Sequence, residues 1–391
     1  MTHTAFAPFH VMVKPIGAIC NLDCEYCYYL SKRDLYRGHS FRMATATLER
    51  YVRQLIESQP AGEVTLAWQG GEPTLLGLEF FQQAVTLAER YRRSDQHIVH
   101  TLQTNGTRLT DDWARFLKEH DFLVGISIDG PPPLHDAYRV DKHGRPTSTQ
   151  VLAGLATLQK RAVAINGLCT VHAGNVEHAL EVYRFLRDEC QISFMQFIPI
   201  VEPIDTPPYV SSRTVNPKLW GQFLIAVFDE WVQRDVGSVF VQIFEAALSA
   251  WLGLPHGLCI FSETCGRALA LEHNGDVYSC DHFVDAEHRL GNLNNTTLVQ
   301  LLDSPQQKQF GNDKQERLAN QCRSCDVLFA CRGECPKNRF ARGPSDDPDL
   351  NYLCSGYQDF FHHINGPMSQ LANLIRHGRS ASEILKLEFR R

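Results

Sequence analysis

Several features that would point to common classes of protein are absent from this sequence. No apolar run is long enough to span a bilayer. The first residues, MTHTAFAPFHVMV, lack the charged start, apolar core and small-residue cleavage site of an export signal. The net charge of −6 gives no basic footprint for nucleic acid. We therefore expect a cytoplasmic protein with neither a membrane nor a nucleic acid among its partners.

What the chain does have is length, apolar content and cysteine. Its 391 residues are 43% hydrophobic, which suits two domains or one large α/β domain with an appendage. Thirteen cysteines need an explanation, because a secreted disulfide protein would be shorter and would carry a signal peptide. In a reducing compartment, clustered cysteines more often bind metal or carry out redox chemistry. Cys169 and Cys190 stand alone, and both are predicted to be small buried hydrophobes.

Residues 10 to about 235 alternate between strand-like and helix-like segments. About six β-α units follow one another, which indicates a parallel sheet that is either open or rolled into a partial barrel. Ligand sites of such sheets gather at the carboxyl ends of the strands. The predicted strands are FHVMVKP, EVTLAW, HIVHTLQ, FLVGISID, VAINGLCTV and SFMQFIPI, and the predicted helices lie at 44–58, 78–91, 110–120, 147–160 and 175–188.

The composition and the periodicity of the sequence change after Pro255. Eight of the thirteen cysteines follow, with short turns and weaker periodicity, so this region is predicted to be a small domain held together by metal. The predicted organisation is a barrel domain over 1–235, a helical linker over 236–255, the cysteine-rich domain over 256–360, and a C-terminal helix and frayed tail over 361–391.

The stretch AICNLDCEYCYYL contains Cys20, Cys24 and Cys27 in the loop after the first predicted strand. A zinc ribbon would show paired knuckles and four ligands, but no further cysteine occurs before Cys169, inside a predicted strand. Thiolates suit zinc or iron–sulfur clusters. An iron–sulfur cubane held by three cysteines leaves one iron open, as a catalytic cluster requires.

This spacing, followed by the aromatic Tyr28, resembles the radical S-adenosylmethionine (AdoMet) enzymes, whose fold is a partial (β/α)6 TIM-type barrel. The resemblance implies that AdoMet chelates the open iron and that its cleavage yields a hydrogen-abstracting 5′-deoxyadenosyl radical. A Gly-Gly pair at a strand end lets the backbone approach a ligand closely. The AdoMet contacts implied by the resemblance are Tyr26, Gly70, Gly71, Glu72, Ser127, Arg139 and Val201.

Eight cysteines in the second region are enough for two fully ligated four-cysteine clusters. The run Cys331-x3-Cys335-Pro336 resembles the ferredoxin ending, in which the last cysteine ligates the other cluster. The ferredoxin-like ending and the resemblance to the SPASM accessory domain imply the same assignment of the eight cysteines to two clusters. One cluster would use Cys259, Cys265, Cys280 and Cys335, and the other Cys322, Cys325, Cys331 and Cys354. Two structural zinc sites are the alternative.

Seven stretches between residue 10 and about 365, among them WQGGEPTLLGLEFF, FLVGISIDGPPPLHDAYR and LNYLCSGYQDFF, look like the anaerobic sulfatase-maturating enzymes. The resemblance implies oxidation of a Cys or Ser side chain of an unfolded sulfatase-type peptide to formylglycine. It also implies Asp281 as the base, an accessory cluster as electron acceptor, and a donor such as flavodoxin or ferredoxin. The candidate substrate contacts are Tyr29, Gln69, Gln103 and Asn105.

One residue departs from the pattern of the family, and two other functions remain as alternatives. Many relatives have Gly-Gly-Cys where this chain has Gly333-Glu334-Cys335, and the carboxylate either lowers a cluster's potential or points to water. Another SPASM-type maturase that cross-links or epimerises a peptide is the nearest alternative. We expect no room here for the N-terminal recognition domain that such enzymes often carry. A zinc-stapled binding protein is the alternative from a different class. The sequence does not distinguish a Cys from a Ser target.

Overall fold

The computed structural model describes residues 5, 7–38, 40–204, 209–343 and 346–386. Contacts divide the chain into two units. The first comprises residues 1–127, 136–165 and 266–312, and the second comprises residues 128–135, 166–265 and 313–391. The two units are defined by contacts between residues and do not test the predicted domain limits, which stay predictions. The last five residues of the predicted frayed tail lie outside the described residues.

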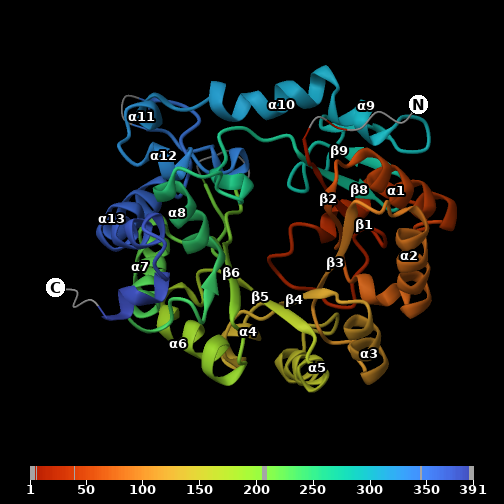
Figure 1. Ribbon diagram of the computed structural model, residues 1–391, viewed down its shortest axis with the longest axis horizontal. Coiled ribbons are helices and arrows are strands. Elements are labelled where there is room, and N and C mark those ends of the chain that lie inside the picture. The colour runs from red at the N-terminus through yellow and green to blue at the C-terminus, as the bar shows by residue number, and fades with distance from the viewer. Residues whose placement is uncertain (1–4, 6, 39, 205–208, 344–345, 387–391) are drawn as a thin grey trace. The chain divides into compact units, whose positions relative to one another are not determined.

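A mostly parallel sheet forms the centre of the first unit (Figure 1), in the strand order β10-β9-β8-β1-β2-β3-β4. Strands β1 to β4 are parallel neighbours, and β8 runs parallel to β1 on its other side. Strands β9 and β10 continue the sheet in antiparallel fashion. Their bounds are β1 His10–Lys14, β2 Gly62–Trp68, β3 Gln96–Thr104, β4 Leu123–Ser127, β8 Ala268–Glu272, β9 Asp276–Tyr278 and β10 Arg289–Asn292.

The helices that follow these strands form where their periodicity and caps predict them. Thr110 accepts a hydrogen bond from the backbone N–H of Trp113 and caps α3, as its position before two acidic residues predicts. Helix α2 also begins and ends at the predicted residues. The helices and short 3-10 turns are η1 Leu30–Tyr36, α1 Thr45–Ser58, η2 Pro73–Leu76, α2 Leu78–Tyr91, α3 Asp111–Glu119, α5 Ser148–Lys160, α9 Leu298–Leu302 and α10 Pro305–Glu316.

The second unit combines three parallel strands with a group of helices. Its strands are β5 Ala164–Val171, β6 Phe194–Pro199 and β7 Phe240–Val241. The helix predicted over 175–188 is divided into a 3-10 turn (η3, Val176–His178), α6 and a π-helical turn (η4, Phe185–Glu189). The other helices and 3-10 turns are α4 Pro132–His135, α6 Ala179–Arg184, α7 Pro217–Arg234, α8 Gln242–Leu252, η5 Cys259–Phe261, α11 Asn320–Arg323, α12 Leu328–Cys331, η6 Pro336–Asn338, α13 Cys354–Arg376 and η8 Ala381–Lys386.

Helices α7 and α13 cross with their backbones in contact. A Cβ atom on Gly356 of α13 would lie 2.0 Å from the carbonyl oxygen of Pro217, and one on Gly221 of α7 would lie 2.6 Å from the carbonyl oxygen of Gly356. Only glycine fits at such a crossing. Stacking of Phe244 in α8 on Phe360 in α13, with ring centroids 5.9 Å apart, extends the same helix group.

Both units bury apolar side chains, and those of the second include Trp220, Phe228 and Phe360. In the first unit, a large cluster of buried apolar side chains joins the sheet to α1, α2 and α3. Around the cysteines of the second unit, one small buried cluster consists of Ala319, Cys322 and Leu350. The two isolated cysteines, Cys169 and Cys190, are 0% and 2% exposed, which confirms their predicted burial.

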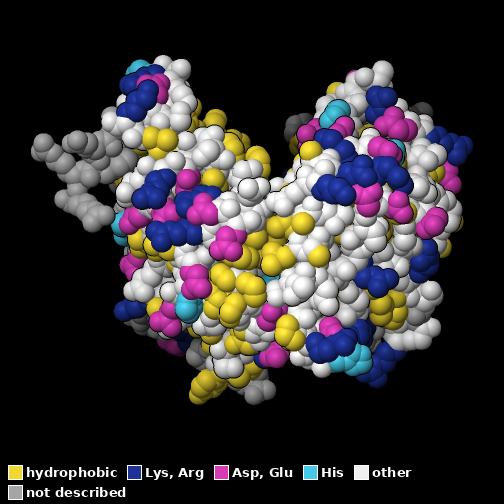
Figure 2. Space-filling view, turned by 90° about the horizontal axis from the view of Figure 1, so that it is seen from below, with side chains coloured by type: hydrophobic (Ala, Val, Ile, Leu, Met, Phe, Trp, Pro, Cys, Tyr) yellow, Lys and Arg dark blue, Asp and Glu magenta, His cyan; other side chains and the backbone are white. Residues whose placement is uncertain are grey.

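The surface carries charges of both signs. Figure 2 shows acidic and basic side chains scattered over one face without a field of a single sign, in keeping with the small net charge. Within the part of the chain that the structure describes, no helix is both long enough and apolar enough to cross a membrane.

Candidate active site and cysteine sites

The three N-terminal cysteines lie in the loop between β1 and η1, and each is half-buried. Backbone hydrogen bonds from Asp23 to Val140 (2.9 Å) and from Glu25 to Tyr138 (3.0 Å) fix the course of this loop. The backbone N–H of Leu22 donates to the sulfur of Cys20 at 3.3 Å. Burial raises the pKa of the Cys20 thiol to about 12. A bound metal centre would therefore have to supply the charge that stabilises the thiolate.

The QGGEP turn after β2 packs directly on the cysteine loop. The N–H groups of Gly71 and Glu72 donate to the carbonyl oxygens of Gly17 and Ile19, at 2.8 and 2.9 Å. A Cβ atom on Gly71 would lie 2.0 Å from the Ile19 carbonyl oxygen, and Gly70 has φ +129°. The turn therefore needs glycine to approach the cysteine loop, a reason that sequence reasoning, which considered only a ligand, did not find.

Glu72 ties the ends of β2 and β3 together. Its carboxylate is 0% exposed and accepts hydrogen bonds from both the backbone and the hydroxyl of Thr74, from the hydroxyl of Thr104, and from the backbone of Asn105. Burial raises the pKa of Glu72 although each of these hydrogen bonds opposes it. If this carboxylate also contacts AdoMet, it must do so while it accepts these hydrogen bonds. The predicted role of Glu72 stays a prediction.

Two other predicted cofactor contacts lie at the end of β4 and in the loop after α4. Ser127, at the end of β4, accepts a hydrogen bond from the side-chain amide of Gln103 at 3.0 Å. The guanidinium of Arg139, which is 7% exposed, lies 5.4 Å from the ring centroid of Tyr26. The first unit thus contains the three cysteines and all the predicted AdoMet contacts except Val201, which is buried in the second unit.

Asp281 is held by two residues of the first unit. Its carboxylate oxygens lie 2.5 Å from the ammonium of Lys14 and 2.5 Å from the hydroxyl oxygen of Tyr28. Burial alone would raise the pKa of Asp281, but Lys14, His282 and the hydrogen bond from Tyr28 outweigh it, so the pKa lies below its ordinary value. The carboxylate is therefore ionised and oriented.

Sequence reasoning missed Lys14 and Glu272, which β1 and β8 place opposite each other in register. Lys14 is 2% exposed, and its ammonium lies 4.5 Å from the ring centroid of Tyr29. The Tyr29 hydroxyl donates to Glu272. The only local signal was a lysine at the end of an otherwise apolar strand, because the partner strand lies far away in the sequence.

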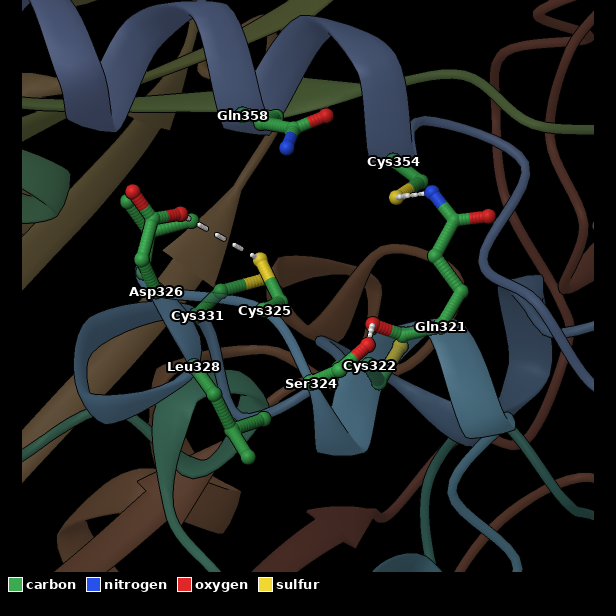
Figure 3. A pocket seen from close by; sticks show the side chains of 11 residues that line it. Gln321, Cys322, Ser324, Cys325, Asp326, Leu328, Cys331, Cys354 and Gln358 are labelled. Carbon is green, nitrogen blue, oxygen red and sulfur yellow. Dashed lines mark hydrogen bonds between the residues drawn. The ribbon is translucent and has the colours of Figure 1, made fainter.

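The cysteines of one predicted accessory site line a single cavity of about 250 Å³ in the second unit. Figure 3 shows them arriving from α11, the turn after it, α12 and the start of α13. Burial raises the pKa of each of three of these thiols, that of Cys354 to about 11. The lining includes Cys322, Cys325, Cys331 and Cys354, together with Gln321, Asp326 and Gln358. Four soft donors around one cavity fit a four-iron cluster.

The cysteines of the other predicted accessory site are divided between the units, with Cys259, Cys265 and Cys335 in the second and Cys280 in the first. Their shared ligation stays a prediction. Among the described residues, no three Cys, His, Asp or Glu side chains are grouped as a single metal ion would require. A four-iron cluster binds each cysteine through a different iron, so its ligands need not converge on one point.

Glu334, the departure noted in the sequence, does not point to water. It is 3% exposed and accepts hydrogen bonds from the side-chain amides of Asn338 (3.1 Å) and Asn351 (2.5 Å). Its φ of +52° is a backbone conformation that glycine adopts more readily. Its effect on a cluster's potential stays a prediction.

Comparisons with known families agree with this arrangement. Residues 15–186 match the Radical SAM superfamily, and residues 259–326 match the iron-sulfur cluster-binding SPASM domain. The fold and the cysteine sites therefore define a radical AdoMet enzyme with an accessory iron–sulfur domain. The chain belongs, within that class, to the family of anaerobic sulfatase-maturating enzymes.

The relatives cover nearly the whole chain. A serine-type anaerobic sulfatase-maturating enzyme of Bacteroides thetaiotaomicron is 42% identical, over 99% of this chain and 97% of the relative. A cysteine-type enzyme of Clostridium perfringens is 31% identical, over 94% of this chain and 100% of the relative. The structure of anSMEcpe with bound AdoMet and Cp18Cys peptide gives a TM-score of 0.85 at 31% identity, covering 94% of this chain and 99% of that one.

A more distant structure shows the fold alone. Streptococcus suis SuiB has a TM-score of 0.60 at 15% identity, over 89% of this chain and 77% of that chain. The comparisons confirm the predicted family, the α/β partial-barrel fold with a C-terminal SPASM domain, and the classes of cofactor, AdoMet and iron–sulfur clusters. The roles of individual site residues stay predictions.

Proposed function

We propose that this protein oxidises the Cβ carbon of a Ser or Cys side chain in a sulfatase-type peptide, giving formylglycine. The observation that carries the proposal is the 42% identity across 97% of an enzyme named for serine-type sulfatase maturation. Serine-type relatives are 37–42% identical and cysteine-type relatives 31–32%, which favours a serine target. A cross-linking or epimerising maturase is the alternative that the Radical SAM and SPASM matches alone leave open.

The cysteine loop would hold the catalytic cluster, and the turn after β2 would hold AdoMet beside it. When bound, these cofactors supply a radical that removes hydrogen from the substrate, and the accessory clusters supply a one-electron acceptor. The surrounding chain positions the groups. Gly70 and Gly71 bring the turn onto the loop, while Ser127 ends β4 and Arg139 lies in the loop after α4. The close fit of this turn on the loop supports the assignment.

Asp281 would accept the proton that leaves the substrate hydroxyl or thiol. The geometry that supports this role is the pair of contacts from Lys14 and Tyr28, which leave the carboxylate ionised and fix its direction. Tyr28 is 41% exposed, so one partner of the carboxylate is also accessible to solvent in part. Lys14 is the positioning residue in this arrangement.

The four predicted substrate contacts differ in burial and in the hydrogen bonds they already make. Gln103 and Asn105 already hydrogen-bond within the protein, to Ser127 and Asn21, so a peptide would have to share or replace these bonds. Tyr29 is 3% exposed and its hydroxyl faces Glu272, which leaves only a ring edge for substrate. Gln69, which follows β2, is half-buried, as Gln103 is, whereas Tyr29 and Asn105 are buried.

The partners follow from the chemistry. The target is an unfolded sulfatase-type peptide, because a folded sulfatase would hide the side chain. A flavodoxin or ferredoxin would supply the electron for the catalytic cluster. A reducing cytoplasm suits both the thirteen cysteines and the clusters.

The test is anaerobic. Reduced, reconstituted protein is incubated with AdoMet and matched peptides that carry S-x-P-x-R or C-x-P-x-R, and 5′-deoxyadenosine and peptide mass are measured. We expect deoxyadenosine together with formylglycine, formed faster from the serine peptide. Deoxyadenosine with an unchanged peptide would retain the radical chemistry and overturn the assignment to sulfatase maturation.

A further inference from the structure

Two buried cations stand among the cysteines of the second unit. Arg339 follows η6 and is 9% exposed. Its guanidinium donates to four carbonyl oxygens, those of Lys314 (2.5 Å), Gly333 (2.9 Å), Arg332 (3.0 Å) and Glu334 (3.2 Å). Three of these carbonyls belong to the turn between the predicted ligands Cys331 and Cys335. The guanidinium therefore organises the backbone that carries two predicted iron ligands.

Lys314 in α10 is the second cation and is 1% exposed. Its ammonium donates to the carbonyl oxygens of Cys259 (2.7 Å) and Ile260 (2.8 Å), in the segment that carries another predicted ligand. Among the described residues, neither Lys314 nor Arg339 forms an ion pair with a carboxylate within 4.0 Å. Every hydrogen-bond acceptor of the two cations is a neutral carbonyl.

Carbonyl groups satisfy the donors of a buried cation but do not balance its charge. The groups that act most strongly on Lys314 include Cys265, Cys259 and Cys335. Those that act on Arg339 include Cys322, from the other predicted cluster site, as well as Cys265 and Cys335. Glu334 is the one carboxyl group among them, and it interacts with both cations. One carboxylate does not balance two cations, so the rest of the matching negative charge would come from the thiolates.

A structural role alone does not require the charges. A neutral amide could donate to one or two of the same carbonyls, and burying a charged donor in its place costs more desolvation. An arginine retains its charge at every relevant pH, so Arg339 is a fixed positive charge close to cysteines of both predicted sites. Adding an electron to a cluster makes it more negative, and a fixed cation nearby favours that change.

We propose that Arg339 is a counter-charge shared by both accessory clusters, that Lys314 serves the cluster of Cys259, Cys265 and Cys335, and that both cations raise the reduction potentials of the clusters they serve. This rests on the proposed function, which assigns accessory clusters to these cysteines. A higher potential makes each cluster a better acceptor for the electron that leaves the substrate. Lys314 and Arg339 are thus tuning residues and do not touch the substrate.

The test measures potentials and not turnover. Midpoint potentials of the accessory clusters are followed by redox titration monitored by electron paramagnetic resonance, with iron quantified in each sample. The samples are the wild type, Arg339→Gln, Arg339→Lys and Lys314→Met. Arg339→Gln should lower both accessory potentials by an amount equal to at least a tenfold change in equilibrium constant, about 59 mV for one electron. Lys314→Met should lower one of them.

Arg339→Lys is the matched control, because it retains the positive charge and loses the guanidinium group that donates to four carbonyl oxygens. Its potentials should stay near those of the wild type even where its iron content falls. Potentials that are the same in all loaded variants would overturn the proposal and leave only a structural role. If Arg339→Gln does not load iron, an unshifted potential in Lys314→Met would overturn it in the same way. A wild type without accessory cluster signals would instead contradict the proposed function.

Discussion

The cysteine loop of the first unit and the cysteine cavity of the second differ in how their thiols are presented and supported. The loop presents three thiols from eight consecutive residues and lies on the end of a sheet with a large apolar core. The cavity is lined by three thiols from residues 322–331 and one from the start of α13, beside a small buried cluster of Ala319, Cys322 and Leu350. We therefore expect the loop to keep its fold without a cluster, and the cavity to depend more strongly on its cluster. An open iron suits the first arrangement, and a closed, fully ligated cluster suits the second.

The largest expected effect comes from Cys24→Ala in the loop. Losing one of three ligands should abolish deoxyadenosine formation and remove about one third of the iron. The unfolding temperature should stay within about 3 °C of the wild type, because the supporting core is untouched. Iron assay, deoxyadenosine yield and calorimetry check this. A collapse in stability would show that the loop, too, depends on its cluster.

Asp281→Asn should lower peptide turnover about 10²- to 10³-fold while all iron is retained. The amide retains the shape of the side chain but cannot accept the proton. Asp285→Asn is the matched control, since Asp285 lies in the same segment and accepts hydrogen bonds from the ring and the backbone of His288, at 2.8 and 3.0 Å. A control that loses as much activity would place the effect in the segment and not in the base, and iron loss in Asp281→Asn would make Asp281 structural.

Cys331→Ala in the cavity should have the reverse pattern of Cys24→Ala. About one third of the iron should be lost, deoxyadenosine should still form, and the unfolding temperature should fall by at least about 5 °C. Cys190→Ala, a buried cysteine of the same unit that is no predicted ligand, should retain all iron. Equal stability of Cys331→Ala and the wild type would end the distinction between a supported loop and a cavity that needs its cluster.

Gly71→Ala tests how tightly the loop is held. The new Cβ would lie 2.0 Å from the Ile19 carbonyl oxygen, so either the loop or the turn must move, at a cost of about 2 kcal/mol. We expect a raised KM for AdoMet with the iron retained. Gly366→Ala has no heavy atom within 4 Å of the new Cβ and should change neither quantity. An unchanged KM in Gly71→Ala would contradict the tight contact.

The last prediction is a pH dependence of the first unit's stability, which is expected to have little effect near neutral pH. His100 in β3 is buried, stacks on Phe122 with ring centroids 4.8 Å apart, and burial lowers its pKa to about 4. A histidine with a lowered pKa binds its proton more readily once unfolded, so its neutral form stabilises the fold fully above pH 6.5. That contribution, about 3 kcal/mol at most, is lost as the pH falls from 6.5 to about 4. Denaturant titrations of His100→Gln should show a weaker dependence over this range.

The sequence predicted what is local. Strand and helix periodicity, the cap at Thr110 and the cysteine spacing all depend on residues a few positions apart, and the structure has each of them. Residues brought together by distant segments were missed. Lys14 meets Asp281 only because β8 pairs with β1, and Arg339 meets Lys314 only because α10 packs against the turn after Cys331. Helix α10 itself is too polar for periodicity to reveal it.

The glycine crossing of α7 and α13 bears on how the chain tolerates mutation. Gly356 stands two residues after Cys354, so the backbone contact with Gly221 sets where the first turn of α13, and with it an iron ligand, is placed. A methyl group on either glycine would displace that ligand without touching any cysteine. In a saturation-mutagenesis screen, Gly221 should therefore score as severely as the cysteines, although nothing near it in the sequence suggests metal binding.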